Sequence, residues 1–512
     1  MAQKKLIFVV VDAMHPGVLM HAVESGRAPT FEALIERGSL IENCVASFPS
    51  VTPVCTSEMM TGAGPGKHGI MGMNWFNRLE SRYVEYGSSF EATRAFGMFR
   101  ALYDLVYNMN LGHLSHEVST IFERLGDAGI RTACTPFLIY RGRHRHEVSL
   151  EGMAKRMAEA IRFRHAVWGP DELFYGDLYA SRKVPCVPTF SRPGTRDEYS
   201  TCVAEELVKK DLYDFMLLSL PDNDFYSHRH GPEAQLESIS RADASLARVI
   251  AAAGGPEKFL ETNAVLLASD HSQTPITDEL PLADALAEDW QVLQPNAEHP
   301  EDAEIAVSPT SRAGAVYVLE GGDRFGVIHE RLRERLRGMD GVDIVAWLAG
   351  PDGTPIERGG PAAYPEGAHA VVERAGAEMR FRPGASGARD RRDNRWALEG
   401  DLTAMAADRT PRRVDSEEYP DGFARLWSAL SSPHAGDVLI SCAPGYECVD
   451  WGGTTHVGGG SHGSLARGDS LAPLIFCGTG PKRPGRRDQW ALRDHASVVL
   501  DHFGLPAPEP AI

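Results

Sequence analysis

The stretch KKLIFVVVDAM, residues 4–14, contains an unbroken apolar run, Leu6–Val11, that ends at the acidic Asp12, and it sets the pattern from which the fold is predicted. Four later runs resemble it: YDFMLLSLPDND at 213–224, NAVLLASDHS at 263–272, GDVLISCAPG at 436–445 and APLIFCGTGP at 472–481. Runs that stay apolar at nearly every position are typical of strands buried on both faces, as in a parallel sheet. We therefore expect these five runs to be strands of a central sheet.

Helical stretches lie between these runs. They are PTFEALIERG at 29–38, EVSTIFERLGDAG at 117–129, SRADASLARVIAAAG at 240–254 and RDHASVVLDHFG at 493–504. This alternation predicts an α/β fold, with a doubly wound, mostly parallel sheet and helices on both of its faces.

Residues 290–435 break the alternation, and we predict that they form a smaller α+β cap inserted into a main domain of residues 1–289 and 436–512. A strand–helix–strand unit is indicated inside the cap by GAVYVLE, VIHERLRERLRG and VDIVAWL, at 314–320, 327–338 and 342–348. The Gly-, Arg- and Asp-rich stretch from Arg374 to Arg413 is expected to be looped.

The charge balance narrows the class of partner. The chain of 512 residues has a formal net charge of −18. A protein this acidic is not expected to bind a nucleic-acid polymer or an anionic membrane through bulk charge. An anionic small molecule would have to be attracted locally, by metal ions or a small basic patch. The sequence carries no signature of an oligomeric state.

The N-terminus and the cysteines bear on the compartment. The apolar run Leu6–Val11 is too short for a signal-peptide core or a membrane span, which favours a cytoplasmic protein without a membrane segment. None of the eight cysteines forms a Cys-x-x-Cys pair. Scattered cysteines in such a chain are expected to be reduced and buried, and a zinc-thiolate site is disfavoured.

Acidic residues follow three of the predicted strands. Asp12 ends the first run, Asp222 and Asp224 follow the second, and Asp270 ends the third. Ligands bind beyond the carboxyl ends of the strands in open α/β sheets, so these side chains are expected to meet there. Clustered carboxylates repel one another and take up protons, and divalent cations would remove that repulsion.

Histidines complete the candidate metal site. Asp224 and His228 are four residues apart, which places both on one face of a helical turn. His271 follows Asp270 directly, and His462 lies in the glycine-rich GGGSHGSL. A mixed oxygen and nitrogen ligand set suits zinc, and also manganese or iron. The competing candidates nearby are Asp222, His230 and His456.

Thr52 is the candidate nucleophile, within SFPSVTPVCTSEMMTG at 47–62. A threonine followed by Pro53 is also a good helix N-cap, because proline is favoured at the first helical position. The two interpretations are compatible. A hydroxyl at a helix N-terminus faces a position that favours anions, and a neighbouring metal ion would ease its deprotonation.

The ordered series of motifs resembles the alkaline phosphatase superfamily, and most closely its nucleotide pyrophosphatase/phosphodiesterase branch. The resemblance covers roughly residues 1–285 and 435–512 and implies an alkaline phosphatase-like fold. The motifs that carry it are VVVDAM at 9–14, FPSVTP at 48–53, TGAGPGKHGIMGMN at 61–74, PDNDFYSHRHGP at 221–232, ASDHS at 268–272, GSHGS at 460–464 and PLIFCGTGPK at 473–482.

The resemblance implies a role for each matching residue. One divalent ion would be held by Asp224, His228 and His462. The other would be held by the remaining four, Asp12, Thr52, Asp270 and His271. It further implies hydrolysis of a small-molecule phosphate ester in two in-line steps, through a phosphothreonine at Thr52. The alignment favours Asp224 over Asp222 and His462 over His456.

Two departures from the family pattern concern the phosphate. The third residue after the family's nucleophile is an Asn that donates to a phosphoryl oxygen, and here it is Cys55, a weak donor. Pro53 has no backbone N–H to offer at the next position. Candidate replacements are Asn74 and the basic loop with Arg141, Arg143, His144, Arg145 and His146.

Other functions stay open at this point. A phosphomonoesterase or a phosphonate hydrolase could use the same scaffold. A sulfatase is disfavoured because PSVTPVCTS lacks the Cys/Ser-x-Pro-x-Arg motif, and a phosphoglycerate mutase because Thr52 stands where Ser is expected. The non-enzyme alternative is a degenerate member that binds a phosphorylated ligand.

Overall fold

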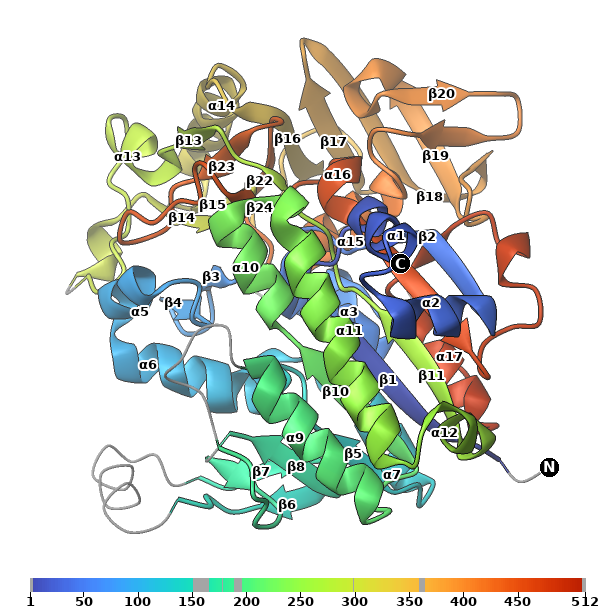
Figure 1. Ribbon diagram of the computed structural model, residues 1–512. Helices are drawn as coiled ribbons and strands as arrows, with labels where there is room; N and C mark the ends of the chain where they lie inside the picture. The colour runs from blue at the N-terminus through green and yellow to red at the C-terminus, as the bar shows by residue number, and fades with distance from the viewer. Residues whose placement is uncertain are drawn as a thin grey trace.

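A nine-stranded sheet forms the centre of the protein (Figure 1). The structure, a computed structural model, describes residues 3–150, 165–176, 178–187, 196–297, 299–358 and 364–508. The strand order is β26 (Trp490–Ala491), β2 (Ser39–Val45), β25 (Leu471–Cys477), β11 (Asn263–Ala268), β1 (Lys5–Val11), β10 (Phe215–Leu220), β5 (Thr132–Cys134), β8 (Glu172–Tyr175) and β9 (Tyr179–Ala180). Strands β11, β1, β10, β5 and β8 are parallel to one another, so the predicted mostly parallel α/β sheet is confirmed.

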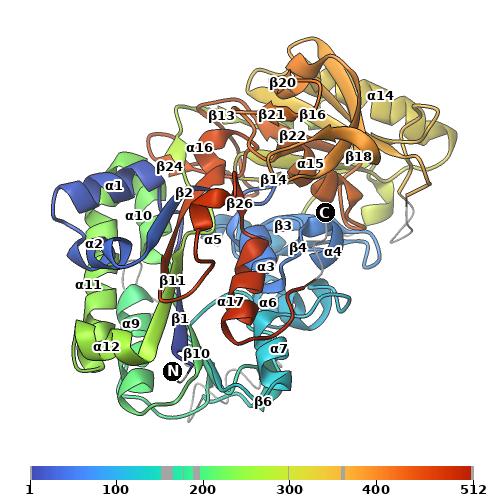
Figure 2. The same ribbon diagram turned by 90° about the vertical axis from the view of Figure 1, so that its right-hand side faces the viewer.

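Helices cover both faces of this sheet, and the side chains of β1 show why the run had to be apolar throughout. Ile7 and Val9 pack in one core with α1 (Pro16–Glu24), α2 (Pro29–Glu36), α9 (Arg196–Lys209) and α11 (Gln235–Ala252). Phe8 and Val10 pack in a second core with α3 (Thr52–Thr61), α7 (Ile121–Asp127) and α17 (Asp494–His502). Alternate residues of one strand therefore fill two cores, and Figure 2 shows α1, α2 and α11 on one side of the sheet and α3 and α17 on the other.

A second, antiparallel sheet of seven strands forms the smaller α+β part. Its order is β14 (Ile305–Thr310), β15 (Ala313–Val318), β22 (Val438–Cys442), β16 (Val342–Ala349), β17 (His369–Arg374), β18 (Ala377–Arg389) and β19 (Arg395–Gly400). Helix α14 (Asp323–Arg337) packs on one face and α15 (Gly422–Ser431) on the other. The unit β15–α14–β16 confirms the predicted strand–helix–strand.

Two predictions of local structure were wrong, those for residues 436–445 and 374–413. The run at 436–445 becomes β22, which pairs with β15 and β16 in the second sheet rather than in the central one. Both faces of β22 are covered by helices, so its apolar pattern cannot tell one sheet from the other. Strand β25 lies in the central sheet but runs antiparallel to β11. The stretch 374–413, expected to be looped, contains all of β18 and all of β19.

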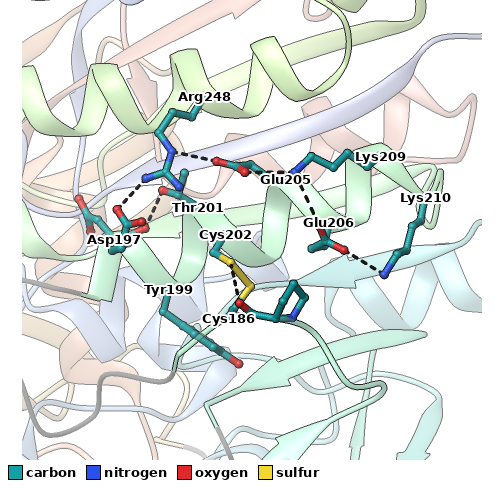
Figure 3. Close-up of a disulfide and its surroundings, with 12 residues drawn as sticks. Cys186, Asp197, Tyr199, Thr201, Cys202, Glu205, Glu206, Lys209, Lys210 and Arg248 are labelled. Atoms are coloured by element: carbon teal, nitrogen blue, oxygen red, sulfur yellow. Dashed lines mark hydrogen bonds and ion pairs between the residues drawn. A yellow bond between two sulfur atoms is a disulfide. The ribbon is translucent and has the colours of Figure 1, made fainter.

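The cysteine prediction also needs correction. Cys186 and Cys202 form a disulfide that joins the segment after β9 to α9 (Figure 3). The six other cysteines are free and buried, as expected. Among the residues that the structure describes, no helix is both long and apolar enough to cross a membrane. The compartment stays a prediction.

Candidate active site

The carboxyl ends of β1, β10 and β11 meet at one edge of the central sheet. Because these strands are adjacent and parallel, the residues that follow them come together in space. The Asp12 N–H donates to the carbonyl of Leu220 at 3.1 Å, and the Ala13 N–H donates to Asp270 Oδ1 at 3.2 Å. Helix α10 (Asp222–His230) begins at the same edge and carries Asp224. The strand-end expectation therefore brings the three aspartates to one place.

One group of ligand atoms consists of Asp224, His228 and His462. Asp224 Oδ1 lies 3.4 Å from His228 Nε2 and 3.6 Å from His462 Nε2, and the two Nε2 atoms are 3.2 Å apart. The glycine-rich loop makes this approach possible. A Cβ on Gly459 would lie 2.0 Å from the carbonyl oxygen of His228, so only glycine fits there.

The second group consists of Asp12, Asp270 and His271, with Thr52 beside it. His271 Nε2 lies 3.7 Å from Asp12 Oδ1, 3.4 Å from Asp270 Oδ2 and 3.2 Å from the Thr52 hydroxyl. The His271 ring is stacked on the His462 ring at 3.8 Å, which joins the two groups. His271 is also close enough to Asp224 and His462 to serve the first group. We call the six Asp and His side chains of both groups the ligand cradle.

Each histidine of the ligand cradle is oriented by the backbone. The Nδ1 atoms of His228, His462 and His271 donate to the carbonyls of Gly460, Ser50 and Ser272, at 2.8, 2.8 and 3.1 Å. A neutral imidazole with its hydrogen on Nδ1 keeps a lone pair on Nε2. The two lone pairs that face each other at 3.2 Å, on His228 and His462, suit a shared cation rather than a hydrogen bond.

The pKa values of the side chains in the ligand cradle also favour a bound cation. Burial, with the charges of Asp270 and Asp224, raises the pKa of Asp12 well above its usual value, and burial raises the pKa of Asp270 to about 6. Burial lowers the pKa of each of the three histidines to about 4, so they are neutral at pH 7. Asp12 Oδ1 and Asp270 Oδ2 are buried without a hydrogen-bond partner. Neutral imidazoles beside buried carboxylates whose negative charge is not compensated form a suitable site for divalent cations.

Thr52 is the first residue of α3, while Val51 occupies the N-cap position. The capping role considered for Thr52 is therefore not realised, and its hydroxyl faces His271 instead. The N–H groups of Val54 and Cys55 both donate to the Val51 carbonyl at 3.0 Å. The first turn thus offers a phosphate few free donors, as the departures at positions 53 and 55 suggested.

The basic loop does not replace the missing donors. Arg141 is buried and bonded to Glu123 and to the carbonyls of Leu114 and Ser115. The strands of the loop, β6 (His144–His146) and β7 (Val167–Gly169), lie at the lower end of the molecule, away from α10 (Figure 1). Arginine-rich sequence could not distinguish a structural ion-pair network from a substrate loop.

Asn74, the other candidate donor, lies on β3 (Asn74–Asn77). Its amide nitrogen donates to the carbonyl of Pro309 at 2.7 Å, and its Oδ1 is buried without a partner. Asn74 and Ser308 line a small cavity of about 10 Å³, the size of one water molecule. A substrate-binding role for Asn74 stays a prediction.

The structure also settles where the competing residues lie. Asp222 and Asp197 form two hydrogen bonds with each other, in each of which a backbone N–H donates to a carboxylate. Asp222 is therefore engaged with α9 rather than with the ligand cradle. The His230 ring packs on Tyr226 at 4.5 Å. The His456 ring lies 4.0 Å from that of His228, and its Nδ1 is 2.8 Å from Glu447 Oε1.

Sequence reasoning missed two residues that position candidate ligands. Gln273 donates to Asp224 Oδ1 at 2.5 Å and so fixes that carboxylate. Asn223 similarly donates to the Asp12 carbonyl at 2.7 Å. Gln273 stands three residues after Asp270, and this closeness to the ASDHS motif was the only signal available.

Comparison with known proteins identifies the family and the fold of the chain. The chain matches the type I phosphodiesterase / nucleotide pyrophosphatase family over residues 6–465. No curated protein sequence matched. Among solved structures, the human ectonucleotide pyrophosphatase / phosphodiesterase 5 is 12% identical, with a TM-score of 0.56 over 99% of this chain and 96% of that one. Phosphonoacetate hydrolase from Sinorhizobium meliloti 1021 is 16% identical, with a TM-score of 0.54 over 98% and 96%.

The family match and the shared fold place the chain in the alkaline phosphatase superfamily. The chain belongs to the type I phosphodiesterase / nucleotide pyrophosphatase family, and it is a phosphoester hydrolase.

Proposed function

We propose that the protein hydrolyses phosphodiesters of small molecules, with Thr52 as the nucleophile and two divalent cations, of which zinc is the first choice, in the ligand cradle. The observation that carries the proposal is the position of the Thr52 hydroxyl, 3.2 Å from His271 Nε2 and beside the carboxylates of Asp12 and Asp270. Manganese or iron would suit the same mixed ligand set.

Each of the two groups of side chains described above would hold one of the two ions. Asp12, Thr52, Asp270 and His271 would hold one ion, and Asp224, His228 and His462 the other. Bound cations in such sites lower the pKa of a hydroxyl and neutralise charge on the oxygens of an in-line displacement. Because Thr52 belongs to one group, the leaving oxygen departs on the side of the other.

The chain itself supplies positioning and an environment that limits water. Helix α3 fixes Thr52 at its first residue, and the buried His271 and Asp270 restrict the approach of water to the hydroxyl. Attack of the Thr52 oxygen on phosphorus forms a phosphothreonine and releases the alcohol. The phosphothreonine still carries the second ester group of the diester, so attack of water on its phosphorus releases a phosphate monoester and restores the Thr52 hydroxyl.

A panel of diesters, monoesters and phosphonates with added zinc or manganese tests this proposal. We expect bis-p-nitrophenyl phosphate to be cleaved faster than p-nitrophenyl phosphate. Thr52→Ala should abolish turnover at nearly unchanged metal content, whereas Thr52→Ser should keep part of the activity. Full activity of Thr52→Ala would remove the nucleophile assignment.

A phosphonate hydrolase is the second candidate. It is favoured by the donors missing at Pro53 and Cys55, since a different phosphate environment suits a different substrate. Faster cleavage of a phosphonate than of any ester in the same panel would select it. Tight binding of phosphate esters without turnover would instead indicate a binding protein.

A further inference from the structure

Helix α10 carries two residues of the ligand cradle, Asp224 and His228, on one face and packs a neighbouring face into the protein. Successive residues of an α-helix turn by about 100°, so Asp224 and His228 share one face. Asn223 and Ser227, on another face, are fully buried. Asn223 donates to the Asp12 carbonyl and accepts from the Ser238 hydroxyl at 2.8 Å. The face that borders the ligands on the solvent side therefore begins at Phe225.

Two arginines lie over the ring of Phe225. The guanidinium carbon of Arg196 is 5.4 Å from the ring centroid, and that of Arg229 is 5.6 Å from it. Both arginines are exposed. Within the described part of the chain, neither guanidinium has a carboxylate at ion-pair distance. A guanidinium stacked on a ring keeps its N–H donors free at its edge, where they can bind a carboxylate or phosphate. We call Arg196, Phe225 and Arg229 the arginine rim.

A pair of helix ends holds Arg196 beside the ligand cradle. The Asp197 N–H donates to Asp222 Oδ2 at 3.1 Å, and the Asp222 N–H donates to Asp197 Oδ1 at 3.0 Å. The first turns of α9 and α10 are therefore tied together. Since Arg196 opens α9 and Asp222 opens α10, the arginine lies next to the helix that carries Asp224.

Helix α9 is anchored at two further points, which Figure 3 shows. The disulfide joins Cys202 to Cys186, and Arg248 of α11 donates to Glu205 at 2.8 Å. These contacts limit the motion of the helix and so the motion of Arg196. The rim is thus mounted on two fixed helices, although its side chains are exposed.

The charge of Arg196 also reaches the ligand cradle. Its guanidinium lies over Phe225, which follows Asp224 directly on α10. In a chain with a net charge of −18, such a local cation is what an anionic substrate needs for attraction to the site.

We propose that the arginine rim binds a second anionic group, a carboxylate or a phosphate, on the leaving-group portion of the substrate. This inference rests on the proposed function, because α10 carries the ligands on the side from which the leaving oxygen departs. The N–H groups of Arg196 and Arg229 would donate to the anion on the leaving group. The Phe225 ring would hold the two guanidinium groups in place by stacking against them. The substrate class is then an ester whose leaving group is itself charged.

Three methyl aryl phosphates that share one scaffold test the proposal. Their leaving phenols carry a neutral amide, a carboxylate or a phosphonate at the same position. For Arg196→Gln, and separately for Arg229→Gln, we expect kcat/KM to fall by about tenfold or more with the two anionic esters, mainly through KM, because a charge-assisted hydrogen bond is lost. With the amide ester, kcat/KM should change less than about twofold.

Arg324→Gln, an exposed arginine of α14, is the matched control and should change none of the three values. An equal loss with all three esters, or no loss with any, overturns the arginine rim while the proposed function stands. If the wild-type enzyme cleaves none of the three, the proposed function itself fails. Preference for the carboxylate or the phosphonate identifies which anion the rim takes.

Discussion

The ligand cradle and the arginine rim lie on adjacent faces of α10, but they are held in opposite ways. Every histidine of the ligand cradle is fixed through Nδ1 by a backbone carbonyl, and Asp270 and His271 are fully buried. The rim is exposed, rests on one aromatic ring and has no carboxylate partner among the described residues. The proposed catalytic chemistry, which is sensitive to small displacements, takes place in the rigid ligand cradle. The proposed selection of the substrate takes place at the accessible arginine rim.

The largest effect is expected inside the ligand cradle. His462→Ala removes a ligand shared with His228 and Asp224, so one ion should be lost and phosphodiesterase activity should fall by at least about a thousandfold. Metal analysis and initial rates measure both quantities. Two retained ions with near-normal rates would show that His462 is not a ligand.

A smaller loss is expected from a residue that only orients the ligand cradle. Gln273→Leu removes the hydrogen bond to Asp224, and metal affinity should weaken by about 10- to 100-fold while saturating metal restores most of the rate. Competition with a fluorescent chelator measures the affinity. Gln291→Leu, an exposed glutamine, is the control, and an equal effect there would contradict the assignment.

The pH dependence of stability separates the metal-free from the metal-loaded ligand cradle. The pKa of Asp270 is raised to about 6, above its unfolded value, so its contribution to the stability of the metal-free fold is lost as pH rises through about 6. Bound cations favour the ionised carboxylates and remove this loss. The rise in Tm on adding zinc should therefore be larger at pH 8 than at pH 5, and Asp270→Asn should reduce the difference. A larger rise at pH 5 would contradict the burial argument.

The smallest effect is expected when one of the contacts that anchor α9, and with it Arg196, is removed. The double variant Cys186→Ser, Cys202→Ser removes the disulfide but keeps the bonds between Asp197 and Asp222. We expect a modest rise in KM for anionic esters, smaller than that of Arg196→Gln, and no change for a neutral ester. Loss of metal from this variant would mean that the two regions are not mechanically separate.

The central sheet could be predicted from the sequence, whereas much of the second sheet could not. Residues such as Ile7 and Phe8 fill cores on both faces of β1, and this leaves an unbroken apolar run. Strand β18 has few buried positions and contains Pro and Gly, so its residues resemble a loop. For β22, the apolar pattern indicated a buried strand but could not specify its neighbours.

The candidate site shows the same division. The positions of Asp12, Asp224 and Asp270 follow from parallel strands that end together, a rule that needs only local sequence. Gln273 and the arginine rim depend on contacts between segments far apart in the chain, as in the stacking of Arg196 on Phe225. Arg141 and Arg143 were misjudged because their shared partner, Glu123, lies outside the motif.

Metal titration of the chelated protein tests the central claim most directly. Diesterase activity should vanish when the cations are removed and return in proportion to added zinc or manganese until about two ions are bound per chain. Full diesterase activity in the metal-free protein, or no binding of either metal to the folded chain, would contradict the two-cation ligand cradle around Thr52.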